Sequence, residues 1–294
     1  MPKQLSRAVS FTWVTVAYVV ALAAAFTVTR AFGPDVHPLW VGAAADAAAT
    51  VAVFAFSVVF DNTSVYDPYW SVAPIAIAPW LAARPEADAA PFARKVLVIA
   101  LVTLWGLRLT YNWAVGSPGL SHEDWRYADM RGKVGRAYWL VSFFGFHFFP
   151  TVLVYLGCLA LYPALTSARP LGPLDALAAA VTLLAIGIEA LADEQLRAFR
   201  KKRRTASEML DTGLWAYSRH PNYLGEVLFW WGVFLFAVAT GGAAWWTVSG
   251  AAAITALFLF VSIPMLDRRS VERKPEYKEY MRRVSPLFPW FPRR

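Results

Sequence analysis

Seven long runs of apolar residues constrain this chain more than any other feature. Each run approaches or exceeds the roughly 20 mostly apolar residues that a helix needs to cross the hydrocarbon core of a bilayer. Only helices and closed barrels satisfy their backbone groups there, so we predict an all-α polytopic membrane protein with one membrane domain over residues 1–294. The predicted spans are Ser10–Phe32, His37–Phe60, Lys95–Trp113, Ala137–Leu165, Leu171–Ala192, Tyr223–Ala239 and Ala243–Leu266.

An eighth apolar stretch, Trp70–Ala83, is shorter and contains Pro74 and Pro79. Proline inside a helix removes a backbone hydrogen bond and kinks or breaks the helix. We therefore expect a re-entrant or interfacial segment here, with a full span as the alternative.

Charge is concentrated outside these runs. The chain is 58% hydrophobic, 16% charged and has a net charge of +8, whereas about a quarter of the residues of a soluble protein are charged. Lys and Arg gather in the loop 197–204, the loop Gly116–Arg136 and the tail beyond Arg268. Such loops face the cytoplasm, so we predict a cytoplasmic C-terminus and, with seven spans, an N-terminus on the opposite side. Topology and an anionic ligand explain the charge better than nucleic acid does.

Metal and disulfide chemistry is not indicated. The single cysteine, Cys158, cannot form an intrachain disulfide, and no pair among the four histidines has metal-ligand spacing. We expect no metal site, and we expect His147, inside a span, to be a packed core residue. Neither G-x-G-x-x-G nor a P-loop is present, which argues against a Rossmann or Walker nucleotide site.

The densest group of polar residues runs from Gly213 to Glu226. Pro221 suits the first turn of a helix, and the positive end of that helix favours phosphate or carboxylate ligands. Arg219, His220 and Asn222 cluster at this end, so we predict an anion site there. The alternative is a loop that anchors a span in the head groups through its aromatic residues.

A second basic face precedes this block. Asp193, Arg197 and Arg200 recur at helical spacing and share one side of a helix. Arginine is suited to bidentate phosphate binding, although basic residues also flank spans for topological reasons. Charged residues within the spans, such as Glu189 and Asp46, either pair with one another or line a polar cavity.

The loop Asp61–Ser71 joins the second span to the broken segment and is rich in polar and aromatic residues. If it dips toward the membrane, it brings Tyr66, Asp67 and Tyr69 over a buried cavity. Tyrosine and a protonated carboxyl are natural proton donors to a substrate carbonyl; an ordinary connecting loop is the alternative. The loop Ser121–Tyr127 could close over a cofactor or cap the bundle.

These residues also resemble a known family. The block Gly213–Glu226, followed by Trp230 and Gly232, resembles the C-terminal region of steroid 5-alpha-reductases, and most closely their bacterial branch (domain of unknown function 1295). Asp193, Arg197 and Arg200 precede this block at the same distance as the matching residues of that family, with no insertion or deletion between them. The tail and the loop before the broken segment match as well, in Pro275–Tyr280, Phe288-Pro289 and Val65–Ser71 with Pro74.

The resemblance implies a seven-span oxidoreductase that acts on CH–CH groups and binds NADPH at its cytoplasmic side, in a bacterial inner membrane. Such enzymes reduce a carbon–carbon double bond conjugated to a ketone, in a lipid such as a 3-oxo-Δ4 steroid that enters from the bilayer. The implied regions are N-terminal spans (1–60), a substrate loop (61–94), middle spans (95–192) and a cofactor-binding region (193–294). The implied cofactor contacts are Arg108, Asp193, Arg197, Arg200, Arg219, His220, Asn222, Tyr223 and Glu226.

The implied catalytic pair departs from the animal enzymes. Tyr66 and Asp67 stand where those enzymes carry Gln and Glu, and Trp105 aligns with a tyrosine that they use. Proton donation therefore falls to another group, with Tyr66 itself as a candidate. The expected substrate contacts are Tyr69, Trp70, Trp105 and Trp230.

Two other interpretations stay open. The Arg-His-Pro-x-Tyr string also resembles isoprenylcysteine carboxyl methyltransferases, which bind S-adenosylmethionine in a similar pocket. The face formed by Asp193, Arg197 and Arg200 favours the reductase, because a methyl donor without phosphates needs fewer arginines. A non-enzymatic lipid-binding membrane protein is the third interpretation, and it predicts no nucleotide binding.

Overall fold

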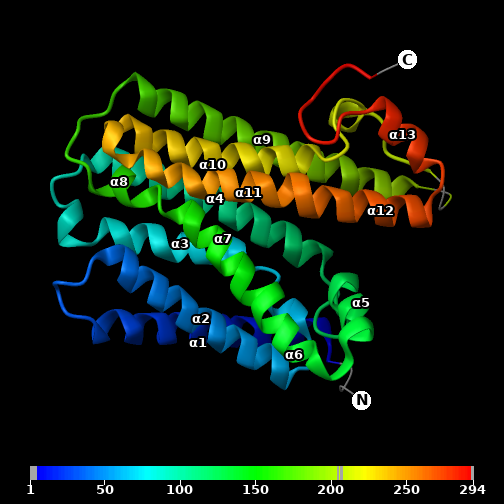
Figure 1. Ribbon diagram of the computed structural model, residues 1–294, viewed down its shortest axis with the longest axis horizontal. Helices are drawn as coiled ribbons and strands as arrows, with labels where there is room; N and C mark the ends of the chain where they lie inside the picture. Colours follow the sequence, from blue (N-terminus) through cyan, green and yellow to red (C-terminus); the bar gives the residue numbers. More distant parts are fainter. Residues whose placement is uncertain (1–4, 204, 206–207, 293–294) are drawn as a thin grey trace.

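The computed structural model describes residues 5–203, 205 and 208–292, and this part of the chain contains helices and no strands (Figure 1). Six helical stretches are long and apolar enough to cross a membrane. This confirms the predicted all-α polytopic membrane protein. The six are Arg7–Ala31 (α1), Pro38–Val59 (α2), Trp125–Thr166, Pro173–Lys202 (α9), Pro221–Ala239 (α10) and Ala244–Arg273.

Two of these stretches are divided into shorter helices. The first comprises α5 (Trp125–Val134), η3 (Gly135–Ala137), α6 (Tyr138–Val141), the π-helical η4 (Ser142–Phe148), α7 (Phe149–Cys158) and α8 (Leu161–Thr166). The second comprises η6 (Gly242–Thr247), α11 (Val248–Leu257), the π-helical η7 (Phe258–Ser262) and α12 (Ile263–Arg273). The remaining helices are η1 (Thr63–Tyr66), α3 (Tyr69–Ala82), η2 (Pro85–Ala87), α4 (Phe92–Gly116), η5 (Gly213–Ala216) and α13 (Tyr277–Arg283).

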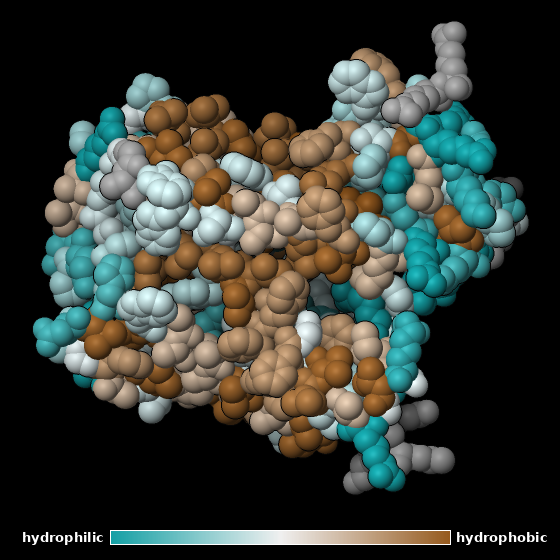
Figure 2. All heavy atoms as spheres, viewed as in Figure 1, coloured by the Kyte–Doolittle hydropathy of each residue, from teal (hydrophilic) through white to brown (hydrophobic). Residues whose placement is uncertain are grey.

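Helix α4 corresponds to the predicted span Lys95–Trp113 and is 25 residues long, although it is not among the six. It runs within the bundle beside α3 and α9 (Figure 1). Figure 2 shows hydrophobic side chains over the middle of one face and hydrophilic side chains gathered toward its ends. This distribution is the one that a bilayer around the long helices requires.

The broken segment forms a short helix with both prolines inside it. At about 1.5 Å per residue, the 14 residues of α3 extend about 21 Å, less than the roughly 30 Å of the hydrocarbon core. Helix α3 nevertheless carries the chain back across the bundle, so that α4 starts at the end opposite to the start of α3 (Figure 1).

This return overturns the predicted position of the N-terminus. The Arg7 side chain donates a hydrogen bond of 2.7 Å to the carbonyl of Ala114, at the end of α4 that leads into the loop Gly116–Arg136. The N-terminal and C-terminal ends of the chain lie at the same end of the bundle (Figure 1). The expectation of opposite sides was wrong because it did not count α3 as a crossing. Which end faces the cytoplasm stays a prediction.

Helices α9 and α10 pack closely because glycines of α10 face α9. A β-carbon on Gly225 would lie 2.5 Å from Cβ of Glu189 and 2.8 Å from the carbonyl oxygen of Ala185. One on Gly232 would lie 2.3 Å from Oγ1 of Thr182. Small residues let helix backbones approach closely in membranes, where apolar surface alone does not select a partner.

We expect Gly225→Ala to lower the free energy of unfolding by about 1–3 kcal/mol, because the new methyl group forces α9 and α10 apart. A β-carbon on Gly187, which lies on α9, would meet no atom within 4 Å. Gly187→Ala should therefore be neutral or stabilise by up to about 1 kcal/mol through helix propensity. Unfolding in detergent micelles, followed by circular dichroism, measures both; equal effects would contradict the close packing.

Candidate functional site

A buried polar cluster joins α4 to α9. The Arg108 guanidinium lies 2.8 Å from Oδ2 of Asp193 through Nη1 and 2.6 Å from Oε1 of Glu189 through Nη2. Asn112 donates to the same Asp193 oxygen at 3.0 Å, and the Arg197 guanidinium donates to Oδ1 of Asn112 at 2.7 Å. The structure thus brings together three predicted cofactor residues and adds Asn112 and Glu189. Asn112 lies four residues after Arg108 on one helix face, a spacing visible in the sequence.

Several polar atoms of this cluster are buried without a hydrogen-bond partner. They are Nε and Nη2 of Arg108 and Oε2 of Glu189; Nη2 is close to Glu189 but poorly oriented for a hydrogen bond. Buried polar groups in native proteins are nearly always paired. The cluster therefore has unused capacity for the polar groups of a ligand or for water.

The guanidinium charges of Arg108 and Arg197 are balanced by the carboxylates of Glu189, Asp193 and Glu194. Besides Asn112, Arg197 binds Oε2 of Glu194 at 2.6 Å. Arg200, one turn further along α9, has an exposed side chain and is followed by Lys201 and Lys202 in the last turn. Arg200 therefore offers the less encumbered positive charge for a phosphate group.

Glu226 lies in the core of α10 and is only 2% exposed. Its two carboxylate oxygens accept hydrogen bonds from the indole nitrogens of Trp105 (3.0 Å) and Trp230 (2.9 Å). Trp105 also stacks on Phe229, with ring centroids 4.2 Å apart. Glu226, a predicted cofactor residue, thus binds the predicted substrate residues Trp105 and Trp230, which are 0% and 2% exposed and lie in the core of the bundle.

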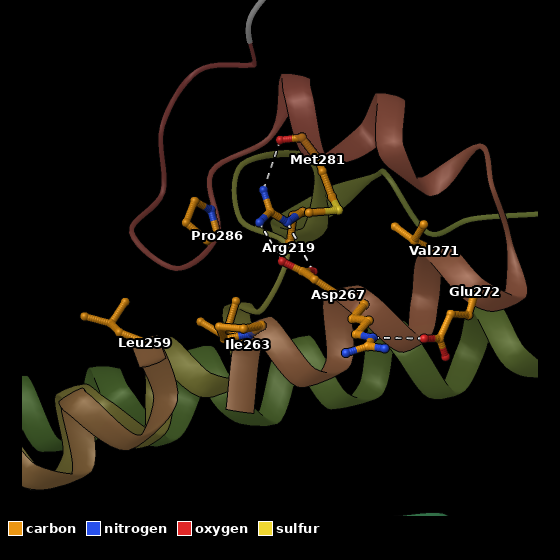
Figure 3. A pocket seen from close by; sticks show the side chains of 10 residues that line it. Arg219, Leu259, Ile263, Asp267, Val271, Glu272, Met281 and Pro286 are labelled. Carbon is orange, nitrogen blue, oxygen red and sulfur yellow. Dashed lines mark hydrogen bonds and ion pairs between the residues drawn. The ribbon is translucent and has the colours of Figure 1, made fainter. Parts of the chain in front are cut away.

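Arg219 and His220 contact the C-terminal segment, as Figure 3 shows for Arg219. The Arg219 Nη2 and the His220 Nε2 lie 2.7 and 3.0 Å from the two carboxylate oxygens of Asp267 on α12. Tyr277 donates to the same carboxylate at 2.9 Å, and Arg219 also donates to the carbonyl of Met281 at 3.1 Å. These bonds fasten α12 and α13 to the start of α10. The cofactor role of Arg219 and His220 stays a prediction.

A cavity of about 530 Å³ lies beside this contact, between α12 and the C-terminal segment (Figure 3). Arg219 and Asp267 line it but are bound to each other. Arg268 and Glu272 also line it and form a pair of their own at 3.1 Å. The cavity therefore offers little unpaired charge for an anion.

Asn222 and Tyr223 occupy the first turn of α10, where Pro221 begins the helix as predicted. The Asn222 amide is half-buried, and no hydrogen bond to its side chain occurs within the described residues. The Tyr223 ring stacks on His220 with centroids 5.4 Å apart. Asn222 is thus available to a ligand at the positive end of the helix.

Tyr66 and Asp67 point to different neighbours. The Tyr66 hydroxyl lies 2.8 Å from Oγ1 of Thr151, and its ring stacks on Tyr69 at 5.0 Å. Asp67 instead accepts a hydrogen bond of 2.6 Å from the hydroxyl of Tyr127 on α5. The two residues of the predicted catalytic pair therefore do not converge on one point in this structure.

The electrostatic surroundings of Asp67 favour its protonated form. Burial raises the pKa of this carboxyl to about 6, against the opposing effects of the Arg126 charge and the Tyr127 hydrogen bond. The start of α5 covers Asp67 and is tied to α12, because the Arg269 guanidinium lies 3.6 Å from the ring centre of Trp125. The loop Ser121–Tyr127 thus caps this end of the bundle.

The other predicted residues lie deeper. Tyr69 is 4% exposed and donates a hydrogen bond of 2.7 Å to Oδ1 of Asp46. Trp70 is half-buried against the hydrophobic core. His147 is fully buried in the π-helical η4 and lies 3.0 Å from the Ser57 hydroxyl, in agreement with its predicted core position.

The two polar regions lie at the same end of the bundle, where α4 and α9 end and α5 and α10 begin (Figure 1). Figure 2 shows a hollow at this end of the molecule, between the region of α12 and that of α5, with hydrophilic residues at its rim. An acid with a raised pKa, unused arginine donors and a free amide are thus placed around one end of an apolar bundle. Within the described residues, no group of three or more His, Cys, Asp or Glu side chains could hold a metal ion.

Comparison with known proteins gives one extensive family match and two relatives. A family model described as "Protein of unknown function (DUF1295)" matches residues 53–284. An uncharacterised protein of Schizosaccharomyces pombe is 28% identical over 251 residues, which cover 78% of this chain and 73% of that protein. Methanethiol S-methyltransferase 1 of Bradyrhizobium diazoefficiens is 35% identical over 78 residues, only 26% of this chain and 25% of that enzyme. No solved structure matches the chain.

Proposed function

Because the chain belongs to the DUF1295 family, a membrane family without an assigned activity, we propose its function from the site itself. We propose an NADPH-dependent, membrane-embedded reductase of a carbon–carbon double bond conjugated to a ketone in a lipid, with a 3-oxo-Δ4 steroid as the leading substrate. The observation that carries this proposal is the Arg108 cluster, in which the buried Nε of Arg108 has no hydrogen-bond partner, at the same end of the bundle as Asp67, an acid whose pKa burial raises.

The residues present fit a phosphate-bearing dinucleotide. The unpaired Nε of Arg108, the exposed guanidinium of Arg200 and the free amide of Asn222 are donors of the kind that phosphate and ribose oxygens accept. Asp193 and Asn112 hold the Arg108 side chain in a fixed orientation. When bound, NADPH supplies the hydride of the reaction.

Asp67 is the group that we propose to deliver the proton. The reduction adds one hydride to the β-carbon and one proton to the α-carbon, and oxidises NADPH to NADP⁺. The ketone oxygen gains negative charge as the hydride arrives, and a donor in a dry site stabilises that charge. Tyr127 orients the Asp67 carboxyl through its hydrogen bond, and burial raises the pKa of this carboxyl to about 6, so that it holds its proton below about pH 6.

The apolar interior would receive the body of the substrate. The carboxylate of Glu226 fixes the rings of Trp105 and Trp230 in the core, where the two ring planes lie 76° apart and form an apolar corner.

A methyltransferase is the second candidate. The 78-residue similarity to methanethiol S-methyltransferase 1 favours it, and S-adenosylmethionine would then bind near Asn222 at the start of α10. That cofactor has no phosphates, so it leaves the exposed guanidinium of Arg200 without an anionic ligand. A protein that only binds lipid would bind neither nucleotide.

Titration calorimetry of the purified protein with NADPH and with S-adenosylmethionine separates these candidates. We expect heat of binding with NADPH, little with S-adenosylmethionine, and oxidation of NADPH when a 3-oxo-Δ4 steroid or another lipid enone is added. Binding of S-adenosylmethionine alone would replace the reductase by the methyltransferase, and binding of neither would leave the lipid-binding protein.

A further inference from the structure

An apolar cavity lies among α1, α2 and α3, apart from the α4–α9 cluster. Its volume is about 180 Å³, and alanine, leucine, valine and aromatic side chains form most of its wall. Leu22 and Phe26 of α1 line the cavity and are also 48% and 65% exposed on the outside of the bundle. The cavity therefore borders the region that lipid chains occupy around α1.

Asp46 places a carboxyl in this apolar wall. The residue is 6% exposed. Its Oδ1 accepts a hydrogen bond of 2.7 Å from the Tyr69 hydroxyl, whereas its Oδ2 is buried and has no partner. No ion pair of the described residues includes Asp46.

A buried carboxyl without a cation is neutral, because an isolated charge is far costlier in an apolar medium than the protonated group. A neutral carboxyl carries one O–H donor. Since Oδ1 is used as an acceptor by Tyr69, the proton belongs on Oδ2. The wall of the cavity thus holds one hydrogen-bond donor without an acceptor, among mostly apolar side chains.

We propose that this cavity binds the end of a lipid that bears an uncharged carbonyl, with Oδ2 of Asp46 donating a hydrogen bond to the carbonyl oxygen. A volume of about 180 Å³ is below the roughly 300–1,000 Å³ of pockets for drug-sized ligands. One end of a chain therefore fits, and the remainder extends along α1 into the bilayer. The site does not depend on the proposed reductase activity. The carbonyl could belong to a ketone or to the ester of a bilayer lipid.

The test uses a long-chain 2-alkanone with a photoreactive diazirine, bound to the full-length protein in nanodiscs of ether-linked phosphatidylcholine, which has no ester carbonyl. Mass spectrometry locates the labelled residues. Asp46→Ala removes the donor, whereas Asp46→Asn keeps an N–H donor beside Tyr69. Ala25→Leu fills the cavity, and Ala23→Leu is its control on the exposed side of α1.

We expect label on cavity-lining residues of α1, α2 or α3. Asp46→Ala should lower subsaturating labelling about tenfold, and Asp46→Asn should keep it within about threefold of the original protein. Ala25→Leu should also reduce labelling, while Ala23→Leu should not. The same thermal unfolding midpoint in all variants excludes a loss of fold as the cause.

Three results would overturn the site: labelling elsewhere, labelling that Asp46→Ala leaves intact, or an Asp46→Asn variant as weak as Asp46→Ala. The last result, together with preferential labelling by an alkylamine of equal length, would show an ionised carboxylate that binds a cation. Nanodiscs of ester-linked lipid identify the source. If these lipids reduce labelling by the 2-alkanone, the natural occupant of the carbonyl site is a bilayer lipid. If they do not reduce it, the natural occupant is a free ketone.

Discussion

Replacing Asp67 by Asn should lower the turnover of NADPH with a lipid enone about 100-fold, while the affinity for NADPH stays within about threefold. The amide keeps the size of the side chain and its acceptor for Tyr127, but it cannot release a proton. Steady-state oxidation of NADPH measures turnover, and calorimetry measures affinity. Tyr66→Phe, which removes the hydroxyl bound to Thr151, is the companion variant.

The two variants identify the donor. If Asp67 delivers the proton, Tyr66→Phe should lower turnover much less than Asp67→Asn does. A larger loss in Tyr66→Phe, with NADPH affinity unchanged, would transfer the role to Tyr66. An equal loss of turnover and affinity in Asp67→Asn would indicate a positional effect and remove Asp67 from the chemistry.

The pH dependence provides an independent check. Burial raises the pKa of Asp67 from 3.8 to about 6, and only the protonated form can donate. Turnover should therefore fall as pH rises above about 6, and this limb should be missing in Asp67→Asn. The same shift means that folding favours the protonated carboxyl, so the stability contributed by this group is complete below about pH 4 and is lost as pH rises to about 6. A turnover profile that is flat across pH 6 would contradict the assignment.

Arg108→Gln should have the second large effect, on both stability and NADPH binding. It leaves Glu189 and Asp193 buried without the guanidinium that pairs with them, and breaking a buried ion pair costs about 3–5 kcal/mol. It also removes a charged donor from the proposed phosphate site, which should weaken NADPH binding about tenfold or more. Thermal unfolding and calorimetry measure the two effects separately.

Arg94→Gln is the matched control, because Arg94 lies on the same helix and is fully buried. Its guanidinium binds Asp175 at 2.7 and 2.9 Å, near the opposite end of α4. It should lose similar stability and keep its NADPH affinity. If Arg108→Gln lowers stability alone, or if Arg94→Gln weakens binding equally, Arg108 has only a structural role.

The sequence predicted the local features of the candidate site. The recurrence of Asp193 and Arg197 on one face of α9, and the start of α10 at Pro221, follow from helical spacing and from the missing amide of proline. The loop before α3 was expected to bring Tyr66 and Tyr69 inward, and both are 4% exposed.

The partners of these residues could not be predicted in the same way. Asp267 binds Arg219 from 48 residues away, and Trp105 binds Glu226 from 121 residues away. The divergence of Tyr66 and Asp67 depends on Thr151 and Tyr127, which come from other parts of the chain. Nothing in the local spacing of these residues specifies such pairs.

By itself, the sequence determined that the chain crosses a membrane repeatedly as helices, because long apolar runs have no other way to satisfy their backbone groups in lipid. Only the tertiary structure decided which helices adjoin and that Arg108 meets Glu189 and Asp193. It also decided that α3 crosses the bundle, so that the N-terminal and C-terminal parts of the chain lie at the same end. The physical reason is that lipid chains are as apolar as the helices. Hydrophobicity therefore places a helix in the bilayer without selecting its neighbours, and close contacts such as that of Gly225 with α9 make the selection.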